Sequence, residues 1–168
     1  MLISETERLS INQLTVQDAP FILTLLNTPT WLRFIGDRGI KNLDEARNYL
    51  LNGPIASYKR LGFGLYLVKL KEGDIPVGIS GLIKRDGLDD VDIGFALHPD
   101  HTGKGYAFEA TAAVMTYARE VLKLTTIVAI TTEDNVHSIA LLLKIGLHYK
   151  KMITLPGNQK EYMLFSSP

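Results

Sequence analysis

The stretch His101-Thr102-Gly103-Lys104-Gly105-Tyr106-Ala107 carries the strongest signal in this chain. It follows the apolar run Val91–Leu97 and precedes a periodic segment over residues 107–122, which together predict a strand, a glycine-containing turn and a helix. Glycines let the backbone approach a ligand closely, and the first N–H groups of a helix have no partner within it. The helix dipole also favours an anion at this end. We therefore expect a phosphate-binding turn, the alternative being a turn that only connects a strand to a helix.

Two common phosphate-binding patterns do not fit this stretch. The chain has no Gly-x-x-x-x-Gly-Lys-Ser/Thr Walker loop, and the Gly-x-Gly of residues 103–105 is followed by Tyr-Ala-Phe rather than by a dinucleotide fingerprint. The stretch instead resembles the cofactor loop of the GNAT superfamily of N-acetyltransferases, whose pattern is Gln/Arg-x-x-Gly-x-Gly/Ala. Thr102 departs from the basic or amide residue at the first position. The departure is tolerable because backbone N–H groups supply most of the contacts to a pyrophosphate.

A second match lies downstream of a segment over residues 125–130 that reads as a strand. The pattern Asn135-x-x-Ser138-x-x-Leu-Leu-x-Lys144-x-Gly-Leu147 is similar to the family's Asn-x-x-Ser-x-x-Leu-Leu-x-Lys-x-Gly-Phe, with Leu147 in place of the Phe. Ser138 and the opening Glu-Thr-Glu-Arg-Leu of residues 5–9 resemble the branch that includes the ribosomal-protein N-terminal acetyltransferases. With Pro-Val-Gly at residues 76–78, the resemblance extends over nearly the whole chain.

Composition limits the remaining possibilities. A length of 168 residues favours a single domain over residues 1–168. Eighteen basic and eighteen acidic side chains balance, so no basic surplus attracts nucleic acid or anionic lipid. The absence of cysteine excludes disulfides, thiolate metal sites and a cysteine nucleophile. There is no basic region followed by an apolar stretch at the start and no run of about twenty apolar residues. We expect a cytoplasmic protein, monomeric or homodimeric, with no metal, nucleic-acid or membrane partner.

The order of the expected elements is β-α-α-β-β-β-α-β-α-β-β, which is not the order of a doubly wound nucleotide-binding fold. It predicts an α/β (α+β) fold with a mixed, centrally splayed seven-stranded sheet flanked by helices, and it agrees with the GNAT architecture. Asn42 or Asp44 is expected near the start of the second helix, and Asn135 is expected to cap the last one. The expected strands cover residues 8–15, 63–70, 77–83, 91–97, 127–130, 147–155 and 161–165.

The resemblance implies how acetyl-CoA would be bound. In the family, the central strand and the strand after the long helix splay apart, and the pantetheine arm lies between them. On this chain the resemblance assigns the pantetheine contacts to Phe95 and Leu97, and a Phe95 N–H to the oxyanion of the reaction. It implies no covalent enzyme intermediate and direct transfer to an amine. The pyrophosphate contacts fall on Thr102, Gly103, Lys104, Gly105, Tyr106 and Ala107.

Further site residues also come from the resemblance, each beside a structural alternative. Asn135 is either a helix cap alone or also a pantetheine contact, and Ser138 is either helix filler or the proton donor to the thiolate. Lys144 occupies a family position near the cofactor, although a cation near a helix C-terminus is favourable in itself. The base that deprotonates the amine is Asp92 as first choice or Glu161 as second, the alternative being a solvated carboxylate at a strand end.

These observations lead to one main hypothesis and two rivals. We expect an acetyl-CoA-dependent N-acetyltransferase whose acceptor is a primary amine, either a peptide N-terminus or a small-molecule amine. The first rival is a non-catalytic acyl-CoA-binding sensor on the same fold, which the departures at Thr102 and Leu147 leave open. The second rival is a nucleotide-binding protein, which the missing Walker and dinucleotide patterns disfavour.

Overall fold

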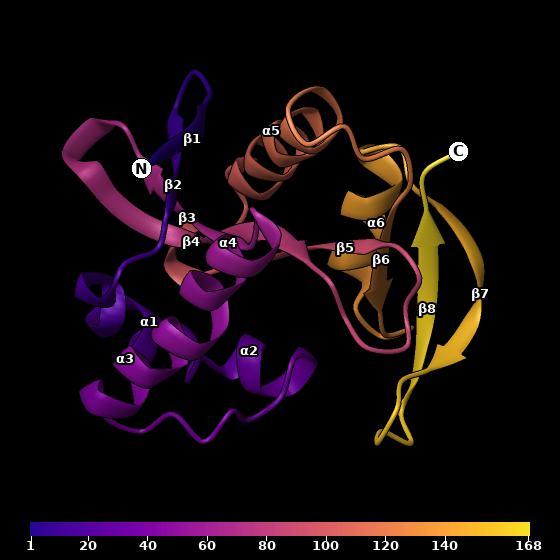
Figure 1. Cartoon of the computed structure of the whole chain (residues 1–168), viewed down its shortest axis with the longest axis horizontal. Coiled ribbons are helices and arrows are strands. Elements are labelled where there is room, and N and C mark those ends of the chain that lie inside the picture. The colour runs from indigo at the N-terminus through magenta and orange to yellow at the C-terminus, as the bar shows by residue number, and fades with distance from the viewer.

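A computed structural model describes residues 1–168 as one eight-stranded sheet with helices on both faces (Figure 1). The strands lie in the order β1-β2-β3-β4-β5-β6-β8-β7. Every neighbouring pair is antiparallel except β5 and β6. The strands are β1 (Leu2–Glu5), β2 (Leu9–Gln13), β3 (Leu65–Leu70), β4 (Ile75–Ile83), β5 (Val91–Leu97), β6 (Ile127–Thr131), β7 (His148–Thr154) and β8 (Glu161–Ser166). The helices are α1 (Ala19–Leu25), α2 (Pro29–Phe34), α3 (Leu43–Leu50), α4 (Ala56–Leu61), α5 (Tyr106–Glu120) and α6 (Val136–Lys144).

The two faces of the sheet are covered by different helices. Tyr66 and Val68 pack in the larger core with apolar residues of α5 and α6. Leu67, which points to the opposite face, packs with Ile79 against α1, α2 and α3. Because side chains alternate along a strand, the sheet separates the α5–α6 layer from the α1–α3 layer. None of the helices combines the length and the apolar composition needed to cross a bilayer.

The predicted mixed, splayed sheet with flanking helices is confirmed, but the predicted number of seven strands is wrong. The eighth strand is β1, an edge strand that pairs antiparallel with β2 and has no buried residue. A four-residue strand with no buried side chain has no alternation of apolar and polar positions that a sequence pattern could reveal. Backbone pairing with β2 defines it instead.

Local signals define the helices that border the splayed region. Asn42 caps α3 through a hydrogen bond from the Glu45 N–H to its Oδ1 at 2.8 Å. Asn135 caps α6 in the same way, with the Ser138 N–H at 3.3 Å from its Oδ1. Both predicted caps are therefore confirmed, Asn42 rather than Asp44 at α3. Gly146, with φ of +95°, follows the end of α6 as expected for a left-handed residue after a helix.

Candidate active site

The centre of the sheet is a fork between β5 and β6. Their parallel pairing is limited to Val91 with Ile127 and Asp92 with Val128, whereas β5 continues to Leu97 with β4 as its only partner. Asp92 is therefore the last residue of β5 that is paired on both sides. Beyond it, the two strands diverge (Figure 1).

The register of β4 and β5 shows which backbone groups face the fork. The His98 N–H donates to the Val77 carbonyl at 2.8 Å, so residues 92, 94, 96 and 98 direct their N–H groups toward β4. The intervening residues, including Phe95 and Leu97, direct their backbone groups to the other side. These groups have lost β6 as a partner, and backbone donors in a half-buried strand need one. The fork can therefore receive an extended ligand that carries amide groups.

The fork leads directly into the glycine loop. Gly103 and Gly105 have φ of +76° and +83°, a left-handed conformation that glycine adopts without strain. Gly105 is the N-cap residue of α5, and its carbonyl accepts the first helical hydrogen bond from the Glu109 N–H at 3.1 Å. The preceding N–H groups of the first turn have no helical acceptor. The loop is exposed from Thr102 to Gly105, so it presents these donors on the surface.

Two neighbouring loop residues have different surroundings. The Thr102 hydroxyl donates to the Pro99 carbonyl at 2.9 Å and so closes the turn before the loop. The Lys104 side chain is exposed, while its carbonyl accepts from Arg8 Nη1 at 3.0 Å. Tyr106 and Ala107 are half-buried in the first turn of α5. The predicted loop residues are thus contiguous around one helix N-terminus, and Thr102 contributes to the shape of the turn.

The N-terminal part of α6 follows β6, the other strand of the fork. Ser138 is buried and its N–H is taken by the Asn135 cap, but its hydroxyl has no hydrogen-bond partner among protein groups. At the other end of α6, Lys144 Nζ lies 4.2 Å from the centre of the Phe108 ring, in the first turn of α5. Lys144 therefore lies against the first turn of α5, held by a contact between a cation and an aromatic ring.

Asp92 has the most perturbed carboxyl group of the chain. It is 1% exposed and forms an ion pair with Arg85, which follows β4. Burial raises the pKa of Asp92 to about 6, against the opposing influence of the Arg85 guanidinium and the Ile130 N–H. Asp92 is thus not a solvated strand-end carboxylate. Glu161 fits that description, because it is exposed at the first position of β8.

The α1–α3 layer contains a pocket beside α3. This pocket, of about 490 Å³, lies between α3 and the segment before it. Tyr49 is one of its lining residues; burial raises its pKa, while Arg38 and Arg85 act in the opposite direction. Arg85, the ion-pair partner of Asp92, is therefore close enough to Tyr49 to affect its pKa. The lining consists of Arg38, Gly39, Ile40, Glu45, Asn48, Tyr49, Asn52 and Gly53.

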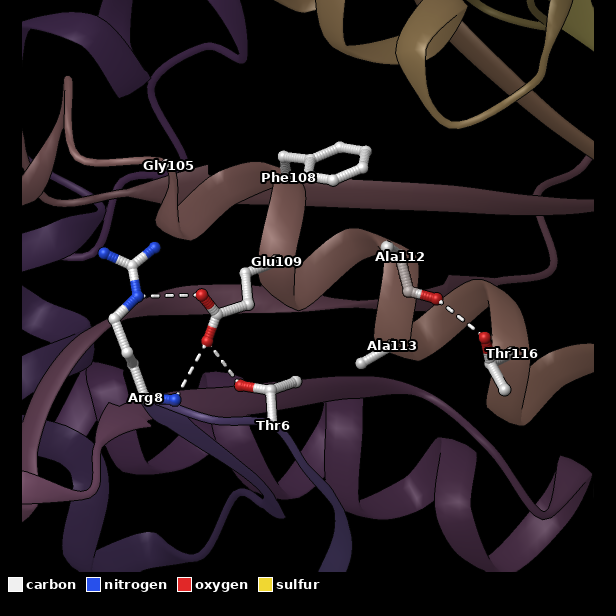
Figure 2. A pocket seen from close by; sticks show the side chains of 8 residues that line it. All are labelled: Thr6, Arg8, Gly105, Phe108, Glu109, Ala112, Ala113 and Thr116. Carbon is white, nitrogen blue, oxygen red and sulfur yellow. Dashed lines mark hydrogen bonds and ion pairs between the residues drawn. The ribbon is translucent and has the colours of Figure 1, made fainter.

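The sequence-based assignment missed one pair of residues at the loop. Arg8 and Glu109 form a salt bridge of 2.8 Å between the segment after β1 and the first turn of α5 (Figure 2). Arg8 belongs to the Glu-Thr-Glu-Arg-Leu signature, which pointed only to a branch of the family. A contact between residues 101 positions apart leaves no local pattern in the sequence.

Comparison with known proteins defines the class to which this fold and site belong. A family model described as an acetyltransferase (GNAT) domain matches residues 8–148. The chain belongs to the GNAT acetyltransferases, and the predicted family and the predicted enzyme class, an acyltransferase, are confirmed.

Individual relatives agree with this membership. The chain is 28% identical over 146 residues to an uncharacterized N-acetyltransferase of Bacillus subtilis, YoaA, covering 86% of this chain and 81% of YoaA. An acetyltransferase structure from Agrobacterium tumefaciens superposes with a TM-score of 0.83 at 24% identity, over 98% of this chain and 93% of the other. The ribosomal L7/L12 α-N-protein acetyltransferase RimL, solved with coenzyme A, superposes with a TM-score of 0.84 at 16% identity, over 99% and 97%. At these identities the two structures establish the shared fold.

Proposed function

We propose that the chain transfers an acetyl group from acetyl-CoA directly to a primary amine. The observation that carries this proposal is the continuity of the site: the free edge of β5 at Phe95 and Leu97 runs into the glycine loop at the start of α5. A ligand that joins an amide-containing arm to a pyrophosphate matches both parts in sequence. Acetyl-CoA is such a ligand, and RimL, which shares the fold, was solved with coenzyme A.

Two kinds of backbone group recognise the cofactor in this proposal. The pantetheine amides pair with the Phe95 and Leu97 groups that β6 leaves free, as an added strand would. The pyrophosphate is bound by the N–H groups of the loop and of the first turn of α5, where the helix dipole favours its charge. Asn135 caps α6 and so fixes the start of the helix that follows β6, the other strand of the fork.

The chemistry follows from the groups that line the fork. A neutral amine attacks the thioester carbonyl, the C–N bond forms, and the oxyanion is stabilised by the Phe95 N–H. The C–S bond then breaks, and the departing thiolate takes a proton from the Ser138 hydroxyl, which no other protein group engages. Asp92 accepts the proton that the amine loses and passes it to solvent, and solvent returns a proton to Ser138. Because the amine attacks the thioester directly, no covalent enzyme intermediate forms.

Asp92 is the proposed base for the amine. A carboxyl group with a pKa of about 6 is mostly ionised at neutral pH, yet it is far more basic than an ordinary aspartate. It lies at the point where β5 and β6 separate, on the strand that carries Phe95. By strand alternation its side chain is on the same face as Ala96, which packs against the α1–α3 layer. The amine would therefore approach from this layer, and the pocket beside Tyr49 lies there.

A thiol-release assay with a panel of amines tests this function. Release of free thiol from acetyl-CoA would be measured with peptides bearing free N-termini, amino acids, polyamines and aminoglycosides. Amine-dependent thiol release, with acetylated amine recovered in equal amount, is the expected result. Binding of acetyl-CoA without turnover on any amine would favour the non-catalytic sensor, and activity confined to hydroxyl acceptors would contradict the proposed reaction.

A further inference from the structure

Arg8 links three parts of the molecule at the glycine loop. Its Nε donates to Glu109 Oε1 at 2.8 Å, and its Nη1 donates to the Lys104 carbonyl at 3.0 Å. Its guanidinium also lies 4.5 Å from the centre of the Tyr106 ring. One side chain thus connects the segment between β1 and β2 with the loop and with the first turn of α5. In Figure 2 the guanidinium lies between Glu109 and Gly105.

Glu109 is itself fixed in place. Its Oε2 accepts from the Thr6 hydroxyl at 2.5 Å and from the Arg8 N–H at 3.1 Å. Partial burial alone would raise its pKa, but the hydrogen bonds from Thr6 and Arg8 outweigh burial and hold the pKa of Glu109 below its usual value. Glu109 is therefore charged at neutral pH and offsets the charge of Arg8. These residues line one end of an open pocket of about 460 Å³ along α5.

The hydrogen bond to Lys104 sets the direction of a peptide group. The Lys104 carbonyl and the Gly105 N–H belong to one planar trans peptide, so they point in opposite directions. Because Arg8 holds the carbonyl, the Gly105 N–H is turned away from Arg8. The glycines on either side of Lys104 would otherwise allow this peptide to rotate at little cost. Ordering a loop costs conformational entropy, and this cost weakens ligand binding unless contacts within the protein already hold the loop in place.

We propose that Arg8, held by Glu109 and Thr6, is a positioning residue that fixes the Lys104–Gly105 peptide in the orientation that accepts the cofactor pyrophosphate. This inference rests on the proposed function for its ligand. Two nitrogens of Arg8 are engaged within the protein, and its charge is offset, so its effect is on the geometry of the loop. Lysine cannot reproduce the effect, because one ammonium group does not match the two fixed directions of Nε and Nη1.

The first test is kinetic and compares two acetyl donors. Arg8→Ala should raise the KM for acetyl-CoA about tenfold, which corresponds to loss of one charge-assisted hydrogen bond, while kcat changes little. The KM for S-acetylpantetheine, which has no pyrophosphate, should not change. Arg8→Lys should resemble Arg8→Ala. Arg119→Ala is the matched control, because Arg119 is exposed in the last turn of the same helix and has no ion pair. An equal KM rise for both donors, or none for acetyl-CoA, would overturn the inference.

The second test needs no activity. Hydrogen exchange of the Glu109 N–H, which donates to the Gly105 carbonyl at 3.1 Å, should be faster in Arg8→Ala than in the wild type, with the melting temperature recorded to confirm folding. Unchanged exchange in the folded variant overturns the positioning role, whether or not the chain acts on acetyl-CoA. Failure of the wild type to bind acetyl-CoA would instead overturn the proposed function, so the two failures are distinguishable.

Discussion

The chain has one arginine–carboxylate pair at the start of β5 and another at the glycine loop, and the two pairs behave in opposite ways. At the start of the strand, Asp92 is 1% exposed, and its pKa is raised to about 6 despite Arg85. Beyond its end, Glu109 is partly exposed, and its pKa is lowered in the presence of Arg8 and Thr6. Burial dominates at the first pair and hydrogen bonding at the second. The same side-chain chemistry therefore yields a carboxyl group with a pKa of about 6 at the fork and one that is charged at neutral pH at the loop.

In the proposed mechanism, this contrast separates the residues that act in the chemical step from those that act in binding. A base must exchange its proton near the working pH, and only the fork pair does so. A residue that fixes a loop should keep one charge state, and the loop pair does. Changes at the fork should alter turnover and its pH dependence, whereas changes at the loop should alter the affinity for acetyl-CoA.

The largest effect is expected for Asp92→Asn. Removal of the base should lower kcat about 10²-fold or more, a typical contribution of general base catalysis. In the wild type, activity should rise with pH through about 6, since Asp92 is protonated below that value and cannot accept a proton. The variant should lack this rise in a profile of kcat/KM from pH 5 to 8. Glu109→Gln is the control that should keep it. If kcat/KM of Asp92→Asn still rises through pH 6, Asp92 has only a structural role at the fork.

Ser138→Ala should also act on turnover. Loss of the proton donor should slow turnover about 10²-fold, while calorimetric titration should give nearly the same affinity for acetyl-CoA. The substitution removes one hydroxyl that has no protein partner, so stability should change little. Wild-type turnover at a saturating amine concentration would assign Ser138 to packing.

A smaller effect, confined to binding, is expected for Gly105→Val. A β-branched residue is strained at φ of +83°, and its Cβ would lie 3.3 Å from an Arg8 nitrogen. Affinity for CoA should fall by about 10- to 100-fold, as expected from a few kcal/mol of strain and lost contacts. Gly157→Val is the matched control: Gly157 has φ of +74° in the turn between β7 and β8, so it suffers similar strain without touching the loop. Equal CoA affinity in a folded Gly105→Val protein would refute the assigned pyrophosphate site.

The last expected effect is on stability rather than on activity, and its sign differs between the pairs. The folded state raises the pKa of Asp92 from 3.8 to about 6, so it binds more protons than the unfolded state between these values. Stability should therefore fall by about 2–3 kcal/mol as the pH rises from 4 to 6. Glu109 contributes the opposite trend, stability that is lost on acidification, and solvent screening limits it to about 1 kcal/mol or less. Melting temperatures of Asp92→Asn against pH would show the first trend removed; an unchanged slope would contradict it.

Features that depend on local backbone geometry could be predicted from the sequence. Left-handed Gly103 and Gly105 and the Asn135 cap each follow from residue type and position along a helix or turn. The fork also followed, through the resemblance to the family. In the glycine turn and the Asn135 cap the interacting groups lie within a few residues of one another, whereas the fork involves distant strands and could be predicted only through the resemblance.

Features that depend on distant partners could not be predicted. The raised pKa of Asp92 requires knowing that Arg85 and Ile130 surround it in a buried position. The pairing of Arg8 with Glu109 depends on the packing of the first strands against α5. Helix α4 was also missed, because Gly53 and Pro54, which lie in the helical residues 51–55 before it, resemble a helix end. In each case tertiary packing selects an arrangement that local propensity leaves open.

The short β5–β6 register also bears on how the chain folds. Strands β1 to β5 lie side by side in chain order and form one half of the sheet, and β6, β8 and β7 form the other half. The halves are joined directly at Val91–Ile127 and Asp92–Val128, across 36 residues of chain. This contact is non-local and consists of only two residue pairs, so we expect it to form after the β3–β4 and β7–β8 hairpins. A molecule bound in the fork would bridge the halves and raise the melting temperature in proportion to the logarithm of its concentration once bound in excess.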